Sequence, residues 1–303
     1  MSKQGFTDTD VPDQSGRSIF ITGANTGLGF EAALVLAGKG ARVLLGCRSR
    51  TKAEAAQGRI LAAYPQADVA IVDLDLGDLE SVRKAAAVVA AEPRLDVLIN
   101  NAGIMMPPRS LTTDGFESQL GVNHLGPFLL TELLLEALEA TPGSRVVHTS
   151  SNAHKAGNIH FDDLTAEQSY SALGRYSQSK LANLLHMYEL DRRLKARGSS
   201  VVTAAAHPGG SDTDLGRHMP KWLFVPVSFV LRPFMNTAAQ GAWPTLMAAT
   251  APGVQGGEYF GPRGMGEMAG PAVQVDSTDR SKDPELARML WDASVELTGA
   301  PAR

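Results

Sequence analysis

The sequence predicts an α/β protein with a single doubly wound parallel sheet of about seven strands in the order 3-2-1-4-5-6-7. Short runs of β-branched residues alternate with Ala- and Leu-rich helical runs along the chain, which is typical of βαβ units with helices on both faces of a sheet. The first of these runs leads through a glycine-rich stretch, TGANTGLGF, directly into a helix. Together these observations indicate a Rossmann-type arrangement.

The expected elements follow from this alternation, and right-handed crossovers favour the doubly wound topology. The expected strands span residues 18–23, 42–47, 68–74, 96–100, 144–151 and 200–209. The expected helices span residues 28–39, 51–63, 79–91, 116–140 and 175–197, with one more near 237–250.

The domain organisation is expected to be simple, because no linker, repeat or low-complexity tract interrupts the chain. We expect residues 1–16 to be a polar leader and residues 17–303 to form one domain. Beyond Gly209 the pattern weakens into a segment rich in Pro and aromatic residues (219–236) and a Gly-rich run. We expect residues 210–240 to form a substrate lid over the carboxyl ends of the strands, where ligands bind in such sheets.

The bulk composition excludes several classes of protein. A net charge of −4 and 20% charged residues in 303 give no electrostatic argument for nucleic acid or an anionic membrane. The polar start is neither a secretory signal nor an anchor, and the longest apolar stretch, 222–235, is too short and too interrupted to span a bilayer. Cys47 is the only cysteine, so no internal disulfide can form and the cytoplasm is the expected location.

The glycine-rich turn places Gly23, Gly27 and Gly29 between the first strand and the first helix. Without Cβ atoms the backbone can approach a pyrophosphate, and the helix N-terminus offers N–H groups to it. The spacing Gly-x-x-x-Gly-x-Gly differs from the commoner Gly-x-Gly-x-x-Gly, and a plain tight turn is the alternative. In this context we predict dinucleotide binding.

The end of the second strand indicates which dinucleotide is bound. NAD-binding units usually carry an acidic residue there to hold the ribose 2′-hydroxyl, but this chain has GCRSR, with Arg48. A guanidinium suits a 2′-phosphate because it offers a forked, charged donor. The alternative is a solvated Arg48 at a helix start. We therefore expect NADP(H) to be favoured over NAD(H).

A Tyr and a Lys share one helical face in GRYSQSKLAN, where Tyr176 and Lys180 lie four residues apart. A free phenol has a pKa of about 10, and a neighbouring ammonium lowers it by favouring the phenolate. Such a pair can exchange a proton with a carbonyl that receives hydride. Taken alone, the two could equally be surface residues of a helix.

These motifs stand in one order with INNAG (99–103), SS (150–151) and HPGGSDT (207–213), each at the end of an expected strand. Over residues 17–260 the arrangement resembles the short-chain dehydrogenase/reductase family. Within the family it resembles the retinol dehydrogenase and protochlorophyllide reductase-like branch, through LINNAGIM, VNHLGPFLLT and YSQSKLANLLH. The 24 residues between Ser151 and Tyr176 also fit that branch.

The resemblance implies four catalytic residues. Tyr176 would donate and accept the proton with Lys180 as its partner, Ser151 would polarise the carbonyl, and Asn123 would act through a water. Ser151 could instead end a strand or cap the segment after it, and Asn123 could repair backbone hydrogen bonds in its helix. The cofactor-binding residues that the resemblance implies are Gly23, Asn25, Thr26, Gly27, Leu28, Gly29, Arg48, Asp75, Leu76, Asn100, Ala102, Gly103, Tyr176, Lys180, Pro208, Gly209 and Thr213. Many NADP-binding members carry a basic residue where this chain has Thr26, which leaves Arg48 as the main candidate for the 2′-phosphate.

The function expected is an NADP(H)-dependent oxidoreductase that interconverts a carbonyl and an alcohol on a hydrophobic small molecule. The alternative is a non-catalytic NADP(H)-binding sensor or scaffold on the same fold, which would have no physical reason to keep all four catalytic residues. No metal site is expected, because the seven His show no ligand spacing. The sequence leaves the substrate, the reaction direction and any homo-oligomer open; the residues between Ser151 and Tyr176 could cover a contact surface.

Overall fold

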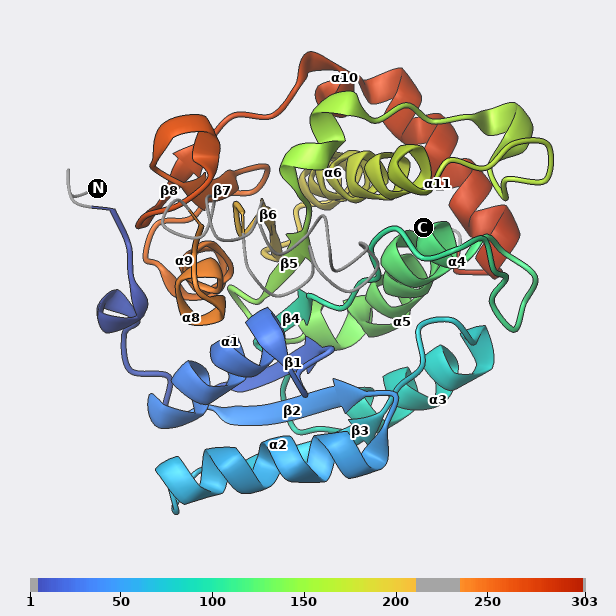
Figure 1. Ribbon diagram of the computed structural model, residues 1–303. Helices are drawn as coiled ribbons and strands as arrows, with labels where there is room; N and C mark the ends of the chain where they lie inside the picture. Colours follow the sequence, from blue (N-terminus) through green and yellow to red (C-terminus); the bar gives the residue numbers. More distant parts are fainter. Residues whose placement is uncertain (1–4, 211–234, 302–303) are drawn as a thin grey trace, which may run out of the picture.

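One sheet of eight strands forms the centre of the computed structural model, which describes residues 5–210 and 235–301. The strand order is β3-β2-β1-β4-β5-β6-β7-β8 (Figure 1). The strands are β1 (Ser18–Thr22), β2 (Arg42–Cys47), β3 (Val69–Asp73), β4 (Val97–Asn100), β5 (Arg145–Thr149), β6 (Val202–Ala206), β7 (Tyr259–Pro262) and β8 (Ala272–Val275). The predicted doubly wound order is therefore confirmed. The sheet has one strand more than expected, because the short β8 pairs antiparallel with β7.

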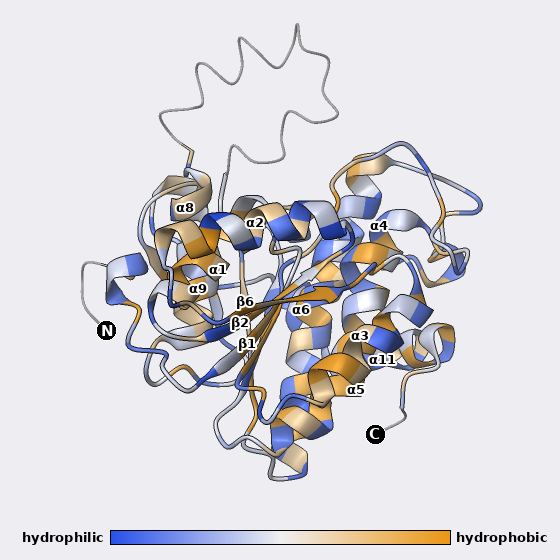
Figure 2. Ribbon diagram, turned by 90° about the horizontal axis from the view of Figure 1, so that it is seen from below, coloured by the Kyte–Doolittle hydropathy of each residue, from blue (hydrophilic) through white to orange (hydrophobic). Residues whose placement is uncertain are grey.

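Helices cover both faces of the sheet, as Figure 2 shows for α1 and α9 on one side and α3, α5 and α11 on the other. Alternate strand residues serve the two faces: Ile19 and Ile21 pack into one core cluster and Phe20 into the other. Because both faces of such a sheet are buried, the sequences of its parallel strands are nearly continuous apolar runs. The helices are α1 (Gly27–Gly38), α2 (Arg50–Ala63), α3 (Leu79–Ala90), α4 (Ser118–Leu120), α5 (Gly126–Glu139), α6 (Ala172–Ala196), α8 (Ala238–Gly241), α9 (Trp243–Thr250), α10 (Asp279–Lys282) and α11 (Pro284–Thr298).

Two expected helices are interrupted. The segment predicted as one helix over 116–140 begins as α4, passes through a π-helical turn, η2 (Gly121–Leu125), and continues as α5. The helix predicted near 237–250 divides into α8 and α9 around Ala242. Pro244 lies in the first turn of α9. Proline is favoured at this place in a helix, which explains why a new helix begins here.

The C-terminal helix α11 was not among the expected elements, although its pattern is readable. Its buried residues recur at helical spacing, with Ala287, Leu290, Trp291 and Ser294 on one face. That face packs against α6 and α5 (Figure 1). Asp283 caps its start by accepting the N–H groups of the first turn.

The part of the leader that the structure describes is packed onto the sheet. Phe6 exchanges two backbone hydrogen bonds of 2.8 Å with Ala272 of β8. The indole N–H of Trp243 in α9 donates to Asp8 Oδ1 at 2.8 Å. The leader thus covers the edge of the last strand, which would otherwise present unpaired backbone groups.

Most of the expected lid, including all of its aromatic residues, lies outside the described residues. Two lid residues that the structure does describe are in contact, because Asn236 N–H donates to Gly210 O at 2.8 Å. In the described part of the chain, no helix combines the length and apolarity needed to cross a bilayer.

Candidate active site

A cavity of about 830 Å³ opens where β1 to β4 end, at the carboxyl edge of the sheet. This is the edge at which doubly wound sheets bind ligands. The loops after these four strands supply most of its lining. Ten residues predicted for the cofactor line it: Gly23, Asn25, Thr26, Gly27, Leu28, Arg48, Asp75, Leu76, Ala102 and Gly103.

The glycine turn has a geometry that side chains would destroy. Gly23 and Gly27 have φ of +68° and +56°, the left-handed region that favours glycine. A Cβ on Gly29 would lie 2.4 Å from Asn101 Nδ2 and 2.6 Å from Gly23 O. Thr26 makes no side-chain hydrogen bond to the start of α1, so N–H groups of the first turn remain for a ligand. The turn fits the pyrophosphate of a dinucleotide.

Asn101 lies at the cavity beside the glycine turn. The residue predicted from the sequence was its neighbour, Asn100. Asn101 lines the cavity and its Nδ2 donates to Thr22 O at 2.8 Å, which ties the end of β4 to the end of β1. The side chain of Asn100 is buried and donates to Thr131 Oγ1 of α5 at 2.9 Å. Successive strand residues face opposite sides, and this alternation could have identified Asn101 as the cavity residue.

Basic side chains gather on the β2 side of the cavity. Arg48 has a side chain 78% exposed, with Nε 4.0 Å from Asp75 Oδ2. Lys52 and Arg59 of α2 also line the cavity, and sequence reasoning missed both. Burial raises the pKa of the adjacent Cys47 thiol to about 11, so that side chain stays protonated near neutral pH.

Tyr176 and Lys180 are brought together on α6. Lys180 is buried, and its Nζ lies 5.6 Å from the centroid of the Tyr176 ring and donates to Thr149 O at 3.3 Å. A Cβ on Gly103 would lie 3.4 Å from Lys180 Nζ and 3.1 Å from Asn123 Oδ1. The ammonium therefore reaches the end of β4, beside the cavity.

Asn123 lies in the π-helical turn η2, a feature that often occurs at functional sites. Its Oδ1 accepts Ile104 N–H at 2.7 Å, and its Nδ2 donates to Ile104 O at 2.9 Å. The same Nδ2 donates to Ser179 Oγ of α6 at 2.9 Å. Asn123 thus joins the loop after β4 to the helix that carries Lys180, rather than bonding within its own helix.

The two serines after β5 have different surroundings. Ser150 is buried and its hydroxyl donates to Lys180 O at 2.8 Å. Ser151 is half-buried and its Oγ accepts Ala153 N–H at 3.2 Å. A hydroxyl that accepts this hydrogen bond still has its own proton to donate, so Ser151 is the better placed of the two to polarise a carbonyl.

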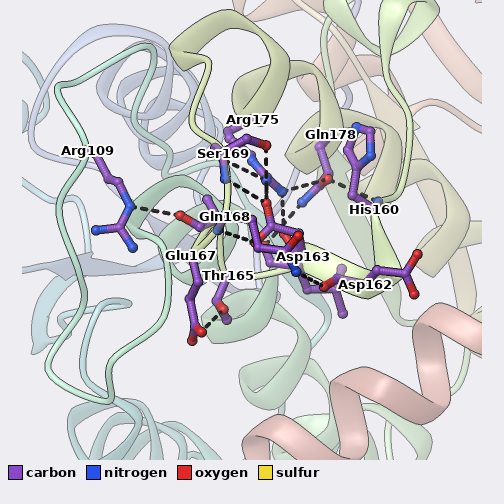
Figure 3. Close-up of polar contacts among 12 residues, drawn as sticks. Arg109, His160, Asp162, Asp163, Thr165, Glu167, Gln168, Ser169, Arg175 and Gln178 are labelled. Carbon is purple, nitrogen blue, oxygen red and sulfur yellow. Dashed lines mark hydrogen bonds and ion pairs between the residues drawn. The ribbon is translucent and has the colours of Figure 1, made fainter.

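The long segment between Ser151 and Tyr176 is held by a buried ion pair (Figure 3). Arg175, only 4% exposed, pairs with Asp163 and donates to Ser169 O at 2.9 Å. Arg109, from the loop after β4, donates to Ala166 O at 2.9 Å. These contacts fix the start of α6 and hence the approach of Tyr176.

His207, directly after β6, contacts Glu267 in the segment after β7, and no pattern in the sequence indicated this contact. Gly209 N–H donates to His207 Nδ1 at 3.3 Å, and Nε2 on the other side of the ring lies 3.0 Å from Glu267 Oε2. The hydrogen bond from His207 lowers the pKa of Glu267, and Lys155 Nζ lies 3.3 Å from the same carboxylate. Gly209 and Pro208 are not among the residues lining the cavity, and Thr213 lies outside the described residues.

Three histidines from different elements form a buried cluster that no spacing in the sequence indicated. The ring of His186 lies 4.7 Å from that of His148 and 6.0 Å from that of His124. Burial lowers the pKa of His124 to about 4 and that of His148 to about 3, and lowers the pKa of His186 well below its usual value. In residues 5–210 and 235–301, no three His, Cys, Asp or Glu side chains are arranged to hold a metal ion.

The sheet order, the glycine turn and the cavity at the carboxyl edge define a dinucleotide-binding α/β protein. Comparison with known proteins then makes the class specific: the family model for short chain dehydrogenases matches residues 17–223. Human retinol dehydrogenase 14 is 43% identical over 302 residues, covering 94% of this chain and 87% of its own. The chain belongs to the short-chain dehydrogenase family, in its retinol dehydrogenase-like branch, and is an oxidoreductase of carbonyl and alcohol groups.

Many solved structures resemble this fold, and two of them are described here by their similarity to this chain. One is an uncharacterised protein from Mycobacterium paratuberculosis, 42% identical, with a TM-score of 0.81 over 99% of this chain and 100% of that one. The other is described as an NAD(P)-dependent gluconate 5-dehydrogenase from Beutenbergia cavernae with bound NADP at low occupancy. It is 25% identical, with a TM-score of 0.61 over 79% of this chain and 92% of that one.

Proposed function

We propose that this protein is an NADP(H)-dependent oxidoreductase that interconverts a carbonyl and an alcohol, with Tyr176 as the general acid and base. The observation that carries the proposal is the buried Lys180 ammonium, 5.6 Å from the Tyr176 ring and next to Gly103 at the cavity. When bound, the nicotinamide supplies or accepts the hydride. The chain must then hold the substrate oxygen and move a proton.

Lys180, Ser151 and Asn123 each support Tyr176 in a different way in this proposal. The Lys180 charge favours the phenolate of Tyr176 and so brings its proton affinity closer to neutrality. The Ser151 hydroxyl donates to the substrate oxygen and stabilises the charge that develops there. Asn123, bonded to both Ile104 and Ser179, keeps the loop after β4 against α6 and is a positioning residue.

The preference for NADP(H) is supported by the charge at the end of β2. Arg48 follows β2 directly and lines the cavity. In NAD-binding units this position usually carries an acidic residue, which holds the ribose 2′-hydroxyl. The NADP bound by the gluconate 5-dehydrogenase-like structure agrees with this choice. The bound cofactor would lie across the glycine turn, Asp75 and the end of β4.

A hydrophobic carbonyl or alcohol is the proposed substrate class. The similarity to retinol dehydrogenase 14 supports it, as do two exposed thioethers after β7: Met265 is 93% and Met268 39% exposed. A Cβ on Gly210, where the expected lid begins, would meet Met268 Cε at 2.4 Å. The cytoplasmic location inferred from the sequence stays a prediction.

The test is the binding of NADPH and NADH to the purified protein by fluorescence titration, for the wild type and Arg48→Ala. We expect NADPH to bind at least tenfold more tightly, a difference of about 1.4 kcal/mol, and Arg48→Ala to remove most of that margin. Equal binding of the two cofactors would contradict the NADP(H) preference. Failure of both to bind would contradict the proposed oxidoreductase function.

A further inference from the structure

We infer that Arg59 is a second cation for the 2′-phosphate of NADP(H), held in place by the ring of Phe30; this inference rests on the proposed function. Arg59 lies on α2, and its Cζ is 3.8 Å from the centroid of the Phe30 ring. Both residues line the cavity together with Arg48. The residues of α2 that face the core are Ala53, Ala56 and Ile60, so Arg59 has no place in the core packing.

The contact with Phe30 explains why this long side chain turns toward the cofactor cavity. A guanidinium over an aromatic face is attracted by the ring, which limits the rotamers of Arg59. Stacking uses the face of the guanidinium and leaves its in-plane N–H groups to bind an anion. Phe30 lies four residues after Thr26, and Phe30 N–H donates to Thr26 O at 3.4 Å. The ring on which Arg59 stacks therefore belongs to the first turn of α1, directly after the glycine turn.

The charges that line the cavity give Arg59 a role that Arg48 does not fill alone. Arg48 Nε is 4.0 Å from Asp75 Oδ2, so part of its charge is already balanced. Glu31 also lines the cavity, but in the described part of the chain no carboxylate lies within ion-pair distance of Arg59. A phosphate monoester carries nearly two negative charges at neutral pH, and NADH lacks this group. A second cation that contacts the 2′-phosphate therefore strengthens the binding of NADPH more than that of NADH.

The experiment compares Arg59→Met with Arg50→Met in fluorescence titrations with NADPH and NADH. Arg50 is the matched control because it lies on the same helix, pairs with Glu54 at 3.1 Å and Asp73 at 3.5 Å, and does not line the cavity. We expect Arg59→Met to weaken NADPH binding about tenfold, equivalent to about 1.4 kcal/mol, and to leave NADH binding unchanged. Arg50→Met should leave both unchanged.

A second variant tests the stacking itself. Phe30→Leu removes the ring but keeps an apolar side chain. It should weaken the binding of NADPH several-fold and change the binding of NADH little. The inference is overturned if the wild type prefers NADPH, Arg48→Ala reduces that preference, and Arg59→Met does not. A wild type without any NADPH preference would instead overturn the proposed cofactor assignment, so the two failures are distinguishable.

Discussion

The two ends of the candidate site are built in different ways. The cofactor end, at β1 and β2, consists of residues close together in the sequence, with Gly23 to Gly29 within one turn and Arg48 directly after β2. The other end, at β5 to β8, is assembled from distant segments, such as His207 with Glu267 and Lys155 with the same carboxylate. A site made of local motifs can be recognised in a sequence, whereas one made of long-range contacts needs the fold.

The largest effect is expected at the second end, from Tyr176→Phe. General acid–base catalysis typically contributes about 10²- to 10⁴-fold to a rate. Removal of the phenol oxygen should therefore lower kcat for carbonyl reduction by about that factor and change the Kd for NADPH far less, because Lys180 and the glycine turn remain. The measurement is NADPH oxidation with an apolar aldehyde or ketone, alongside a titration of the cofactor.

A tyrosine in the same segment provides the control for this prediction. Tyr170 donates its O–H to Pro107 O at 2.6 Å, a contact that positions the segment and takes no part in proton transfer. Tyr170→Phe should change KM more than kcat, by less than tenfold. If Tyr176→Phe kept more than a tenth of the wild-type kcat, Tyr176 would not be the proton donor.

The next largest effect is expected on the stability of the fold in acid, because of the buried cluster of His124, His148 and His186. Their pKa values are lowered by burial, from 6.5 to about 4 for His124, so the unfolded chain binds protons that the folded chain does not. Stability should be fully present above pH 6.5 and be lost as the pH falls from 6.5 toward 4. A shift of this size corresponds to about 3 kcal/mol of unfolding free energy for His124 alone.

Urea unfolding at pH 7.5, 5.5 and 4.5 measures this loss. His186→Phe should make the unfolding free energy less dependent on pH, because it removes one of the rings that resist protonation. The exposed His160 is the control, and His160→Gln should leave the pH dependence as in the wild type. An identical slope for His186→Phe and wild type would contradict the role of this cluster in acid sensitivity.

A smaller effect is expected at the cofactor end, from Gly29→Ala. The new Cβ would overlap Asn101 Nδ2 and Gly23 O, and such overpacking typically costs about 1 to 3 kcal/mol. The melting temperature should fall and NADPH binding should weaken. Gly58→Ala on α2 is the matched control: its Cβ would meet nothing within 4 Å, so it should stabilise the protein by about 0.5 to 1 kcal/mol. A melting temperature for Gly29→Ala equal to that of the wild type would show that the turn can relax.

The sequence was sufficient to predict the strand order and ten of the residues that line the cavity, because the alternation of apolar strands with helices and the glycine turn are both local sequence patterns. It did not reveal β8, whose four residues are too few to establish a period, nor the interruption of the 116–140 helix at Asn123. Asn101 was missed because INNAG contains two Asn, and only the register of β4 separates the buried one from the one at the cavity. Arg59 was missed because stacking on Phe30 joins two helices that no motif connects.

The position of Cys47 has a practical consequence for labelling experiments. It is the only thiol in the chain, it is buried behind the glycine turn, and burial raises its pKa. The thiolate is the form that attacks a thiol-directed reagent, so the native protein should react slowly with a maleimide dye. A cysteine introduced at the exposed Thr26 would then carry the dye alone, and protection of that position by nucleotide would report occupancy directly.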